Sequence, residues 1–319
     1  MSDFAFGFSI FKFLTIMPIA LFFIDGLGIG ARDPEKNPFA KFPSRFFNFF
    51  LNEPLPDLPF GGKIIPTSAG MGIPGLPQSA TGQTAIFCGV KSAQIVGRHI
   101  SGFPTPTLRS LLQEHSIFRK LHDAGQTATF ANALSKEYFE NRGERISATT
   151  RALLAGDYPW RTFEDLRDGR AVSHDLTNEF LRQMKVDAPL RTPDESAGIL
   201  AEIIIQNDFT LFEFILTDMI GHNQEMAAAE NIVQRLDTLL SVVLNRLDLQ
   251  TTTIILTSDH GNFEDLSVKT HTMNPVPTMV WGKGQAIVLE RVKAIEDIAD
   301  AIQRICVDGV EMPPSLHHL

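Results

Sequence analysis

The chain has 319 residues, of which 44% are hydrophobic and 20% are charged, and its formal net charge is −9. Such a composition is typical of a globular protein with a substantial core, and the acidic balance argues against a nucleic-acid-binding protein, which normally carries a basic patch. The two cysteines, Cys88 and Cys306, lie far apart and outside any CxxC motif. They favour a reducing compartment, so we expect a cytoplasmic protein.

The first predicted element is a buried strand at residues 16–24. The segment FLTIMPIALFFI is as apolar as a signal peptide or membrane anchor, but it is too short to cross a bilayer and no small-residue cleavage site precedes Asp25. A near-continuous apolar run is what a parallel strand covered on both faces requires, so we expect no membrane association. Because MPIALFFIDG resembles a complete first strand beginning at Met17, we expect residues 1–16 to be an extension of little structural use.

Helix and strand patterns alternate along most of the remaining chain, which favours an α/β fold with a mainly parallel sheet. We expect a helix that begins near Ser79 and further helices at 108–121, 197–206 and 289–306. An amphipathic helix is marked by one apolar face of Ile232, Leu236, Leu239, Val243 and Leu247. Strands are expected at 127–131, 210–216, 251–257 and 278–282.

The segment 133–195 differs from its surroundings because it has few strand-like runs and many arginines. We predict that it forms a small cap inserted into a core made of residues 1–132 and 196–319. The planar guanidinium group of arginine suits carboxylate or phosphate, whereas the alternative for any one of them is a solvated helical surface. The cationic candidates are Arg142, Arg145, Arg151, Arg161, Arg167, Arg170, His174 and Arg191, and among them we expect substrate contacts from Arg151, Arg161 and Arg170.

Three of the predicted strands end in aspartate, at Asp25, Asp218 and Asp259. Ligands bind at the carboxyl ends of the strands in doubly wound sheets, so we expect these side chains to converge. A single aspartate in such a place would more simply be a helix N-cap. The presence of three, two of them accompanied by histidine, favours a common site.

Three histidines accompany these aspartates. His222 follows Asp218 by four residues, which places both side chains on one face of a helix. His260 directly follows Asp259, and His271 precedes the stiff segment NPVP. Mixed carboxylate and imidazole ligation fits Zn²⁺ or Mn²⁺, and six such ligands are too many for one tetrahedral ion and suit two. Two ions can clamp the attacking and leaving oxygens of a phosphoryl transfer.

The segment SATGQ places two hydroxyl groups, Ser79 and Thr81, at the start of a predicted helix. Either could be an N-cap, but a serine hydroxyl also becomes a nucleophile when a metal ion lowers its pKa. The N-terminus of a helix offers backbone N–H groups to phosphoryl oxygens. One residue can both begin the helix as its N-cap and act as the nucleophile, so the two interpretations do not exclude each other.

The motifs DGLG, SATGQ, TDMIGH, SDHGN and HTMNPVP, in this order, resemble those of the alkaline phosphatase superfamily. The similarity covers residues 16–131 and 196–305 and is greatest with the branch of cofactor-independent phosphoglycerate mutase and phosphopentomutase. It implies a three-layer α/β/α core and two metal ions. The resemblance assigns a first ligand set of Asp218, His222 and His271 to one ion and a second ligand set of Asp25, Asp259 and His260 to the other. It also implies that Ser79 is a further ligand of the second ion and the nucleophile. Thr81 is the alternative nucleophile.

Two features depart from the mutase pattern. Gln83 stands where these mutases have histidine, so it can donate a hydrogen bond to substrate but cannot carry charge. The predicted cap is far smaller than the second domain of phosphoglycerate mutases, so activity on phosphoglycerate does not follow from the resemblance. Lys269, just before THT, is a further candidate for phosphate binding.

These features predict a phosphatase or phosphomutase that acts on a small phosphomonoester through a phosphoserine intermediate. One alternative is a phosphodiesterase or sulfatase-like hydrolase on the same core, although SATGQ lacks the C/S-x-P-x-R motif of sulfatases. Another alternative is a non-catalytic metal-binding protein.

Overall fold

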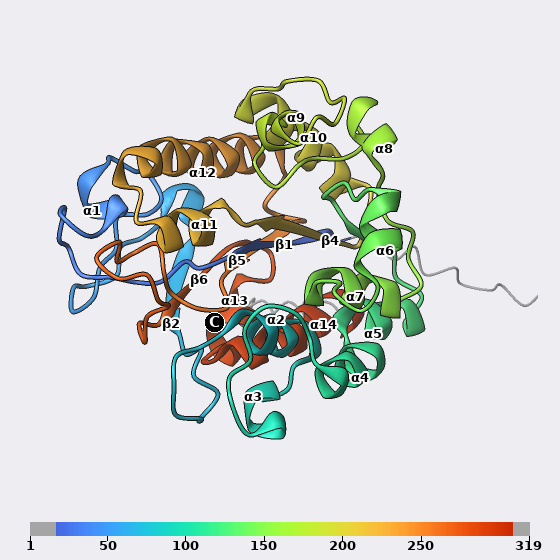
Figure 1. Ribbon diagram of the computed structural model, residues 1–319, viewed down its shortest axis with the longest axis horizontal. Helices are drawn as coiled ribbons and strands as arrows, with labels where there is room; N and C mark the ends of the chain where they lie inside the picture. The colour runs from blue at the N-terminus through green and yellow to red at the C-terminus, as the bar shows by residue number, and fades with distance from the viewer. Residues whose placement is uncertain (1–16, 309–319) are drawn as a thin grey trace, which may run out of the picture.

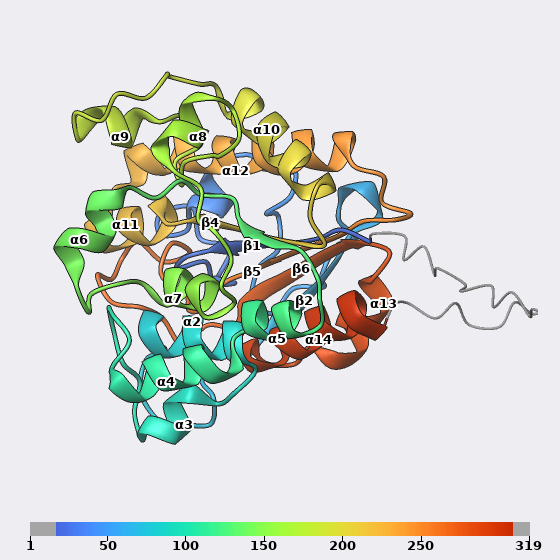
Figure 2. The same cartoon turned by 90° about the vertical axis from the view of Figure 1, so that its right-hand side faces the viewer.

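The computed structural model describes residues 17–308, and the expected extension at residues 1–16 lies outside the described residues. A six-stranded sheet in the order β2-β6-β5-β1-β4-β3 lies between two layers of helices (Figures 1 and 2). The strands are β1 (Ile19–Ile24), β2 (Lys63–Thr67), β3 (Ala128–Phe130), β4 (Phe209–Phe214), β5 (Thr253–Thr257) and β6 (Val276–Gly282).

The sheet is mostly parallel, as the sequence predicts. β1 pairs in parallel with β4 and β5, and β3 pairs in parallel with β4, whereas β6 runs antiparallel to both β5 and β2. β1 is fully buried because its alternate side chains enter apolar clusters on opposite faces of the sheet. No helix between residues 17 and 308 is long and apolar enough to span a membrane.

Strand β2 is not among the strands predicted from the sequence. It contains Pro66, which cannot donate a hydrogen bond to a neighbouring strand. β2 lies at one edge of the sheet, where proline is tolerated because one side of the strand has no partner. Because proline is unfavourable inside a sheet, Pro66 made this edge strand difficult to predict from the sequence.

One helical layer, above the sheet in Figure 1, contains the long helix α12 and packs on Phe22, Phe212 and Leu256. The predicted apolar face of α12 is buried, which anchors this layer. The helices on this side are α1 (Pro38–Lys41), α10 (Pro193–Ile205), α11 (Leu216–Asn223) and α12 (Met226–Arg246).

The other layer packs on Leu21, Phe23 and Ile255 and lies below the sheet in Figure 1. Its helices are α2 (Ser79–Cys88), α3 (Ser92–Val96), α4 (Pro106–His115), α5 (Ile117–Asp123), α13 (Gln285–Arg291) and α14 (Ile298–Gln303). The expected helix at 108–121 is in fact two helices, because the side chain of Ser116 accepts a hydrogen bond from Arg119 N and so starts α5. The expected helix at 289–306 is likewise interrupted after α13, by a short 3₁₀ turn, η2 (Ile295–Asp297).

The segment 133–195 contains four short helices, α6 (Lys136–Arg142), α7 (Ala148–Ala155), α8 (Phe163–Arg167) and α9 (Glu179–Gln183). Leu166, Ala171, Leu181 and Ala188 form a small apolar cluster of their own. The helix α7, in contrast, buries Ala148, Ala152 and Leu153 in the same cluster as residues of α2 and α5. The division of the chain into core and cap stays a prediction.

Replacement of Leu236 by alanine tests the layer that α12 forms. Leu236 is fully buried, so we expect the variant to lose about 2–5 kcal/mol of unfolding free energy through lost burial and a residual cavity. Leu190 is 60% exposed, and its replacement by alanine should change the stability by less than about 0.5 kcal/mol. Urea denaturation followed by circular dichroism measures both, and equal losses would contradict this packing.

Candidate metal centre

The predicted ligands come together where β5, β1 and β4, three adjacent strands, reach their carboxyl ends. Asp25 directly follows β1, and Asp259 and His260 follow β5 after one intervening residue. Asp218 and His222 lie on α11, which begins two residues after β4. His271 lies on the loop that precedes β6. Parallel strands thus bring residues that are far apart in sequence to one edge of the sheet.

The second ligand set is centred on His260. Its Nε2 atom lies 3.5 Å from Oδ1 of Asp25, 3.4 Å from Oδ2 of Asp259 and 3.0 Å from Oγ of Ser79. Asp259 and His260 are fully buried, and Asp25 is 9% exposed. Four potential ligand atoms therefore converge, and three of them belong to buried side chains.

The first ligand set is centred on Asp218. Its two carboxylate oxygens lie 3.3 Å from Nε2 of His222 and 3.7 Å from Nε2 of His271. The opposite ring nitrogens, Nδ1, lie 2.7 Å and 2.8 Å from the backbone oxygens of Lys269 and Pro77 respectively. Donation from Nδ1 to a carbonyl leaves Nε2 with a free lone pair, which is the usual arrangement of a metal-binding histidine.

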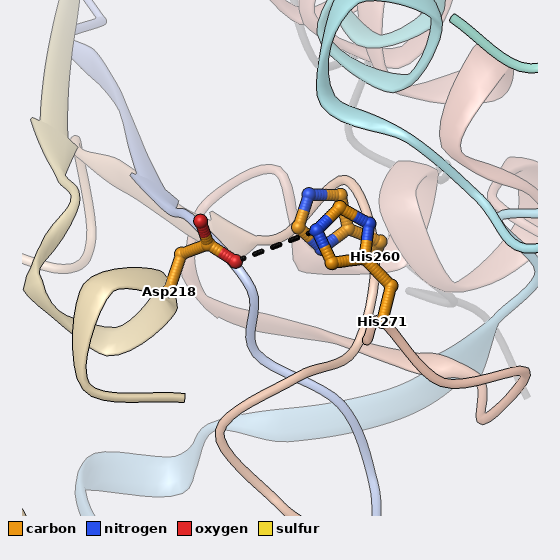
Figure 3. Close-up of side chains that lie close together, drawn as sticks. All are labelled: Asp218, His260 and His271. Atoms are coloured by element: carbon orange, nitrogen blue, oxygen red, sulfur yellow. Dashed lines mark ion pairs between the residues drawn. The ribbon is translucent and has the colours of Figure 1, made fainter. Parts of the chain in front are cut away.

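The two ligand sets adjoin each other. The rings of His260 and His271 stack with centroids 3.5 Å apart and planes 13° apart, and Asp218 faces both rings (Figure 3). Asp218, His260 and His271 also bring ligand atoms within 4.8 Å of one another, as do Asp25, Asp259 and His260. The six residues therefore form one continuous cluster, in which His260 contacts both sets.

The charges of this cluster fit divalent cations. Burial, followed by the charges of neighbouring aspartates, raises the pKa of Asp25 well above its usual range and raises that of Asp259 to about 8. Burial also holds the pKa of His260 well below its usual range. One oxygen of Asp25 and one of Asp259 accept no hydrogen bond from the residues that the structure describes. Bound cations would neutralise these carboxylates and supply partners for those oxygens.

Ser79 and Thr81 lie in different environments. Ser79 is the first residue of α2, and the preceding residue, Gln78, is the N-cap. Thr81 is fully buried, donates from Oγ1 to Gln78 O at 3.1 Å and accepts from Ile100 N at 3.2 Å. The hydroxyl of Ser79 thus faces the ligand cluster, whereas that of Thr81 is engaged by the backbone.

The start of α2 packs directly against the loop after β5. A Cβ atom added to Gly82 would lie 2.7 Å from Cβ of Asp259, so only glycine fits there. The Gln83 side chain donates from Nε2 to Oδ2 of Asp259 at 3.4 Å. Gln83 therefore contacts a predicted ligand, and its predicted role in substrate binding stays a prediction.

The cationic candidates have other partners. Arg151 donates to Glu144 O, Arg161 donates to Thr129 Oγ1 and Arg170 O, and Arg170 pairs with Asp165 and Asp168. No contact between these three arginines and the six predicted ligands is seen within residues 17–308. The backbone oxygen of Lys269 lies beside His222, and its side chain is exposed. Substrate binding by these four residues stays a prediction.

Sequence reasoning did not identify Glu213 and Thr149. Oγ1 of Thr149, on α7, donates to Oε1 of Glu213, on β4, at 2.8 Å. The charge of Glu213 contributes to the raised pKa of Asp25, and burial raises the pKa of Glu213 itself to about 7. The one available signal was a charged residue inside the apolar run TLFEFIL. Among the described residues, Glu213 belongs to neither group of possible ligand atoms that lie within 4.8 Å of one another, so it influences the cluster through its charge.

The raised carboxyl pKa values predict how pH affects the metal-free protein. A carboxyl whose pKa rises on folding stabilises the fold while it is protonated, and this contribution is lost as the pH rises through the folded-state pKa, which is about 8 for Asp259. With a chelator present, we expect the melting temperature to fall between about pH 7 and about pH 9, and Mn²⁺ to reverse the fall.

Thermal unfolding followed by circular dichroism measures this dependence. Asp259→Asn removes the titrating group, so its melting temperature should depend less on pH. A melting temperature that rises over the same interval in the wild type would contradict the assignment of these carboxylates.

Comparison with known proteins shows which family and which curated proteins this chain resembles. Residues 188–306 match the family model described as the Metalloenzyme superfamily. The 2,3-bisphosphoglycerate-independent phosphoglycerate mutase of Desulforudis audaxviator is 27% identical over 134 residues, which are 39% of this chain and 26% of that protein. The matched segments span between 20% and 27% of the length of the first three curated relatives.

One solved structure, that of the PH0037 protein, shares the fold, and others align less closely. The PH0037 protein from Pyrococcus horikoshii aligns with a TM-score of 0.55 and 15% identity over 94% of this chain and 99% of that one. The alkaline phosphatase from the Antarctic bacterium TAB5 aligns with a TM-score of 0.46 and 14% identity over 93% of this chain and 100% of that one. The resemblance that the motifs indicated is confirmed: the chain carries a Metalloenzyme superfamily match at residues 188–306 and has cofactor-independent phosphoglycerate mutases among its homologues.

Proposed function

We propose that this protein is a two-metal phosphoryl-transfer enzyme that acts on a small phosphomonoester through a phosphoserine at Ser79. The observation that carries the proposal is the position of Ser79 Oγ, 3.0 Å from His260 Nε2 and at the first residue of a ten-residue helix. A hydroxyl placed between a ligand cluster and a helix N-terminus has what a phosphoryl acceptor needs.

The ligand sets suit two divalent ions, Mn²⁺ or Zn²⁺, since both contain carboxylate and imidazole groups. Asp218, His222 and His271 would hold one ion, and Asp25, Asp259 and His260 the other. Bound ions would neutralise charge on the phosphoryl oxygens and lower the pKa of the Ser79 hydroxyl. Five of these six residues lie in the segment 188–306, and the similarity of that segment to the Metalloenzyme superfamily supports a metal-dependent role for it.

The start of α2 provides a place for the phosphoryl oxygens. The backbone N–H groups of Thr81 and Gly82 already donate to Ile100 O and Gln78 O. The N–H groups of Ser79 and Ala80 precede them in the first turn, and we assign the phosphoryl oxygens to these two donors. The partial positive charge of the helix N-terminus favours the same anion.

The reaction has two transfers. Ser79 Oγ loses its proton and forms a bond to phosphorus while the ester bond to the substrate alcohol breaks, and the departing alcohol oxygen takes up one proton, so the proton count is unchanged. Water or a second hydroxyl then takes the phosphoryl group from Ser79, which gives a phosphatase or a mutase respectively. Gln83 lies close enough to Asp259 to orient the acceptor by a hydrogen bond, but its amide cannot act as an acid at this step.

Replacement of Ser79 by alanine tests the nucleophile. We expect no phosphoenzyme and a fall in kcat of roughly 10³-fold or more, because the covalent step is lost. The metal content should remain near that of the wild type, since six other ligands are retained. Acid-quenched labelling with a ³²P substrate and metal analysis measure these two quantities.

Thr81→Ala is the matched control for this experiment. It also removes one hydroxyl from the first turn of α2, and it should still form the phosphoenzyme. Loss of the phosphoenzyme in Thr81→Ala, with its retention in Ser79→Ala, would assign the nucleophile to Thr81 instead.

Substrate class is tested with p-nitrophenyl phosphate and bis-p-nitrophenyl phosphate, each with Mn²⁺, Zn²⁺ and Mg²⁺ in turn. We expect the monoester to be turned over faster than the diester, and Mn²⁺ or Zn²⁺ to support more activity than Mg²⁺ because histidines complete both ligand sets. Faster hydrolysis of the diester would instead support a phosphodiesterase. Release of p-nitrophenol at 405 nm follows both reactions.

A further inference from the structure

Glu264 is a buried carboxylate beside the metal centre that belongs to neither ligand set. It is 1% exposed and lies where three loops meet. One loop follows β1 and carries Asp25, one follows β5 and carries Asp259 and His260, and one precedes β6 and carries His271. A side chain that binds all three loops at one point can fix the distances between their ligands.

Each oxygen of Glu264 accepts two hydrogen bonds. Oε2 accepts from Gly28 N at 3.0 Å and from Asn262 N at 2.7 Å. Oε1 accepts from Thr272 Oγ1 and from Asn274 Nδ2, the latter at 3.0 Å. Gly28 lies on the loop after β1, Asn262 on the loop after β5 and Thr272 on the loop before β6. The carboxylate therefore connects all three loops. Because both oxygens are used in this way, Glu264 is not available as a metal ligand.

The backbone encloses this carboxylate closely. A Cβ atom on Gly28 would lie 2.3 Å from the carboxyl carbon of Glu264, and a Cβ atom on Gly261 would lie 2.3 Å from its Oε1. Real Cβ atoms do not approach other atoms so closely, so any other residue at either position would displace the carboxylate. The space that Glu264 occupies therefore explains the second glycine of DGLG, Gly28, and the glycine of SDHGN, Gly261.

The contacts of Glu264 extend to the first ligand set as well. Asn262, whose backbone N–H binds Glu264, donates from Nδ2 to Oδ1 of Asp218 at 2.7 Å. A displacement of the loop after β5 would thus move a partner of Asp218 together with Asp259 and His260. The carboxylate of Glu264 influences both ligand sets through this loop.

We propose that Glu264 is a positioning residue that sets the geometry of both metal sites by joining the three ligand-bearing loops, an inference that rests on the proposed metal-dependent function. Glu264 would act through the loops and would not itself be a ligand of either ion, since its oxygens accept hydrogen bonds from the loops. Partners of this kind typically change metal affinity 10- to 100-fold when they are removed.

The test compares Mn²⁺ binding by three variants, using isothermal titration calorimetry and the Mn²⁺ electron paramagnetic resonance spectrum. Glu264→Gln keeps the length of the side chain: its amide oxygen can accept from Gly28 N and Asn262 N, and its NH₂ group can face Thr272 Oγ1 and a turned Asn274 carboxamide. Glu264→Asp keeps the charge but is too short to reach both pairs of donors. Glu264→Ala loses every one of these bonds.

We expect Glu264→Gln to bind Mn²⁺ nearly as the wild type does, and Glu264→Asp and Glu264→Ala to bind it about 10- to 100-fold more weakly, with altered resonance spectra. Glu296→Gln is the control, because Glu296 is also a buried carboxylate but lies near the C-terminal end of α2, away from the three loops. The Mn²⁺ affinity of this variant should equal that of the wild type. The comparison of Gln with Asp remains informative even if the alanine variant does not fold.

Two results would overturn the inference alone: wild-type affinity in folded Glu264→Asp and Glu264→Ala, or binding by Glu264→Gln that is as weak as that of Glu264→Asp. A wild-type protein that binds no Mn²⁺ or Zn²⁺ would overturn the proposed function and the inference together. The binding measurement separates these cases without any assay of activity.

Discussion

Repulsion among buried carboxylates is the constraint on which the arrangement of this site depends. Asp25, Asp218 and Asp259 lie at the ends of adjacent strands, with Asp25 and Asp259 almost excluded from water. Uncompensated, such charges are among the most costly groups that a protein interior can hold, as the raised pKa values of Asp25 and Asp259 indicate. The strands β1 and β5 are fully buried, so the surrounding fold can tolerate a local energetic penalty that cations would remove.

The rest of the site is arranged around this constraint by close backbone contact. Carbonyl groups from Lys269 and Pro77 orient two histidine rings, and Gly82 lets α2 approach the loop after β5. Ser79 then faces His260 from the start of α2. The positions of the two histidine rings and of Ser79 therefore depend on the backbone of neighbouring loops and of α2. The geometry of the ligands is thus a property of the packed loops as a whole.

The sequence predicted those features that a local pattern determines. The apolar run of β1, the aspartates at strand ends and the spacing of Asp218 and His222 identified the core fold and six residues that the structure brings together. It did not predict Thr149 or Glu264, because their contacts are made with residues that are distant in the chain, and a threonine in a helix or a glutamate after DHGN has no distinctive local pattern. Helix ends were also misplaced where a single side chain, such as that of Ser116, starts a new helix.

The place of Ser79 at the first position of α2 has a consequence for the helix itself. The side chain of Ser79 faces His260, and Gln78, the N-cap, makes no side-chain hydrogen bond to the first turn. A capping side chain commonly contributes about 1 kcal/mol to a helix, and α2 lacks that contribution. An oxyanion bound to the first N–H groups would take the place of the missing cap. The bound anion and the first turn of α2 would then stabilise each other, so anion binding and the stability of this helix end would be coupled.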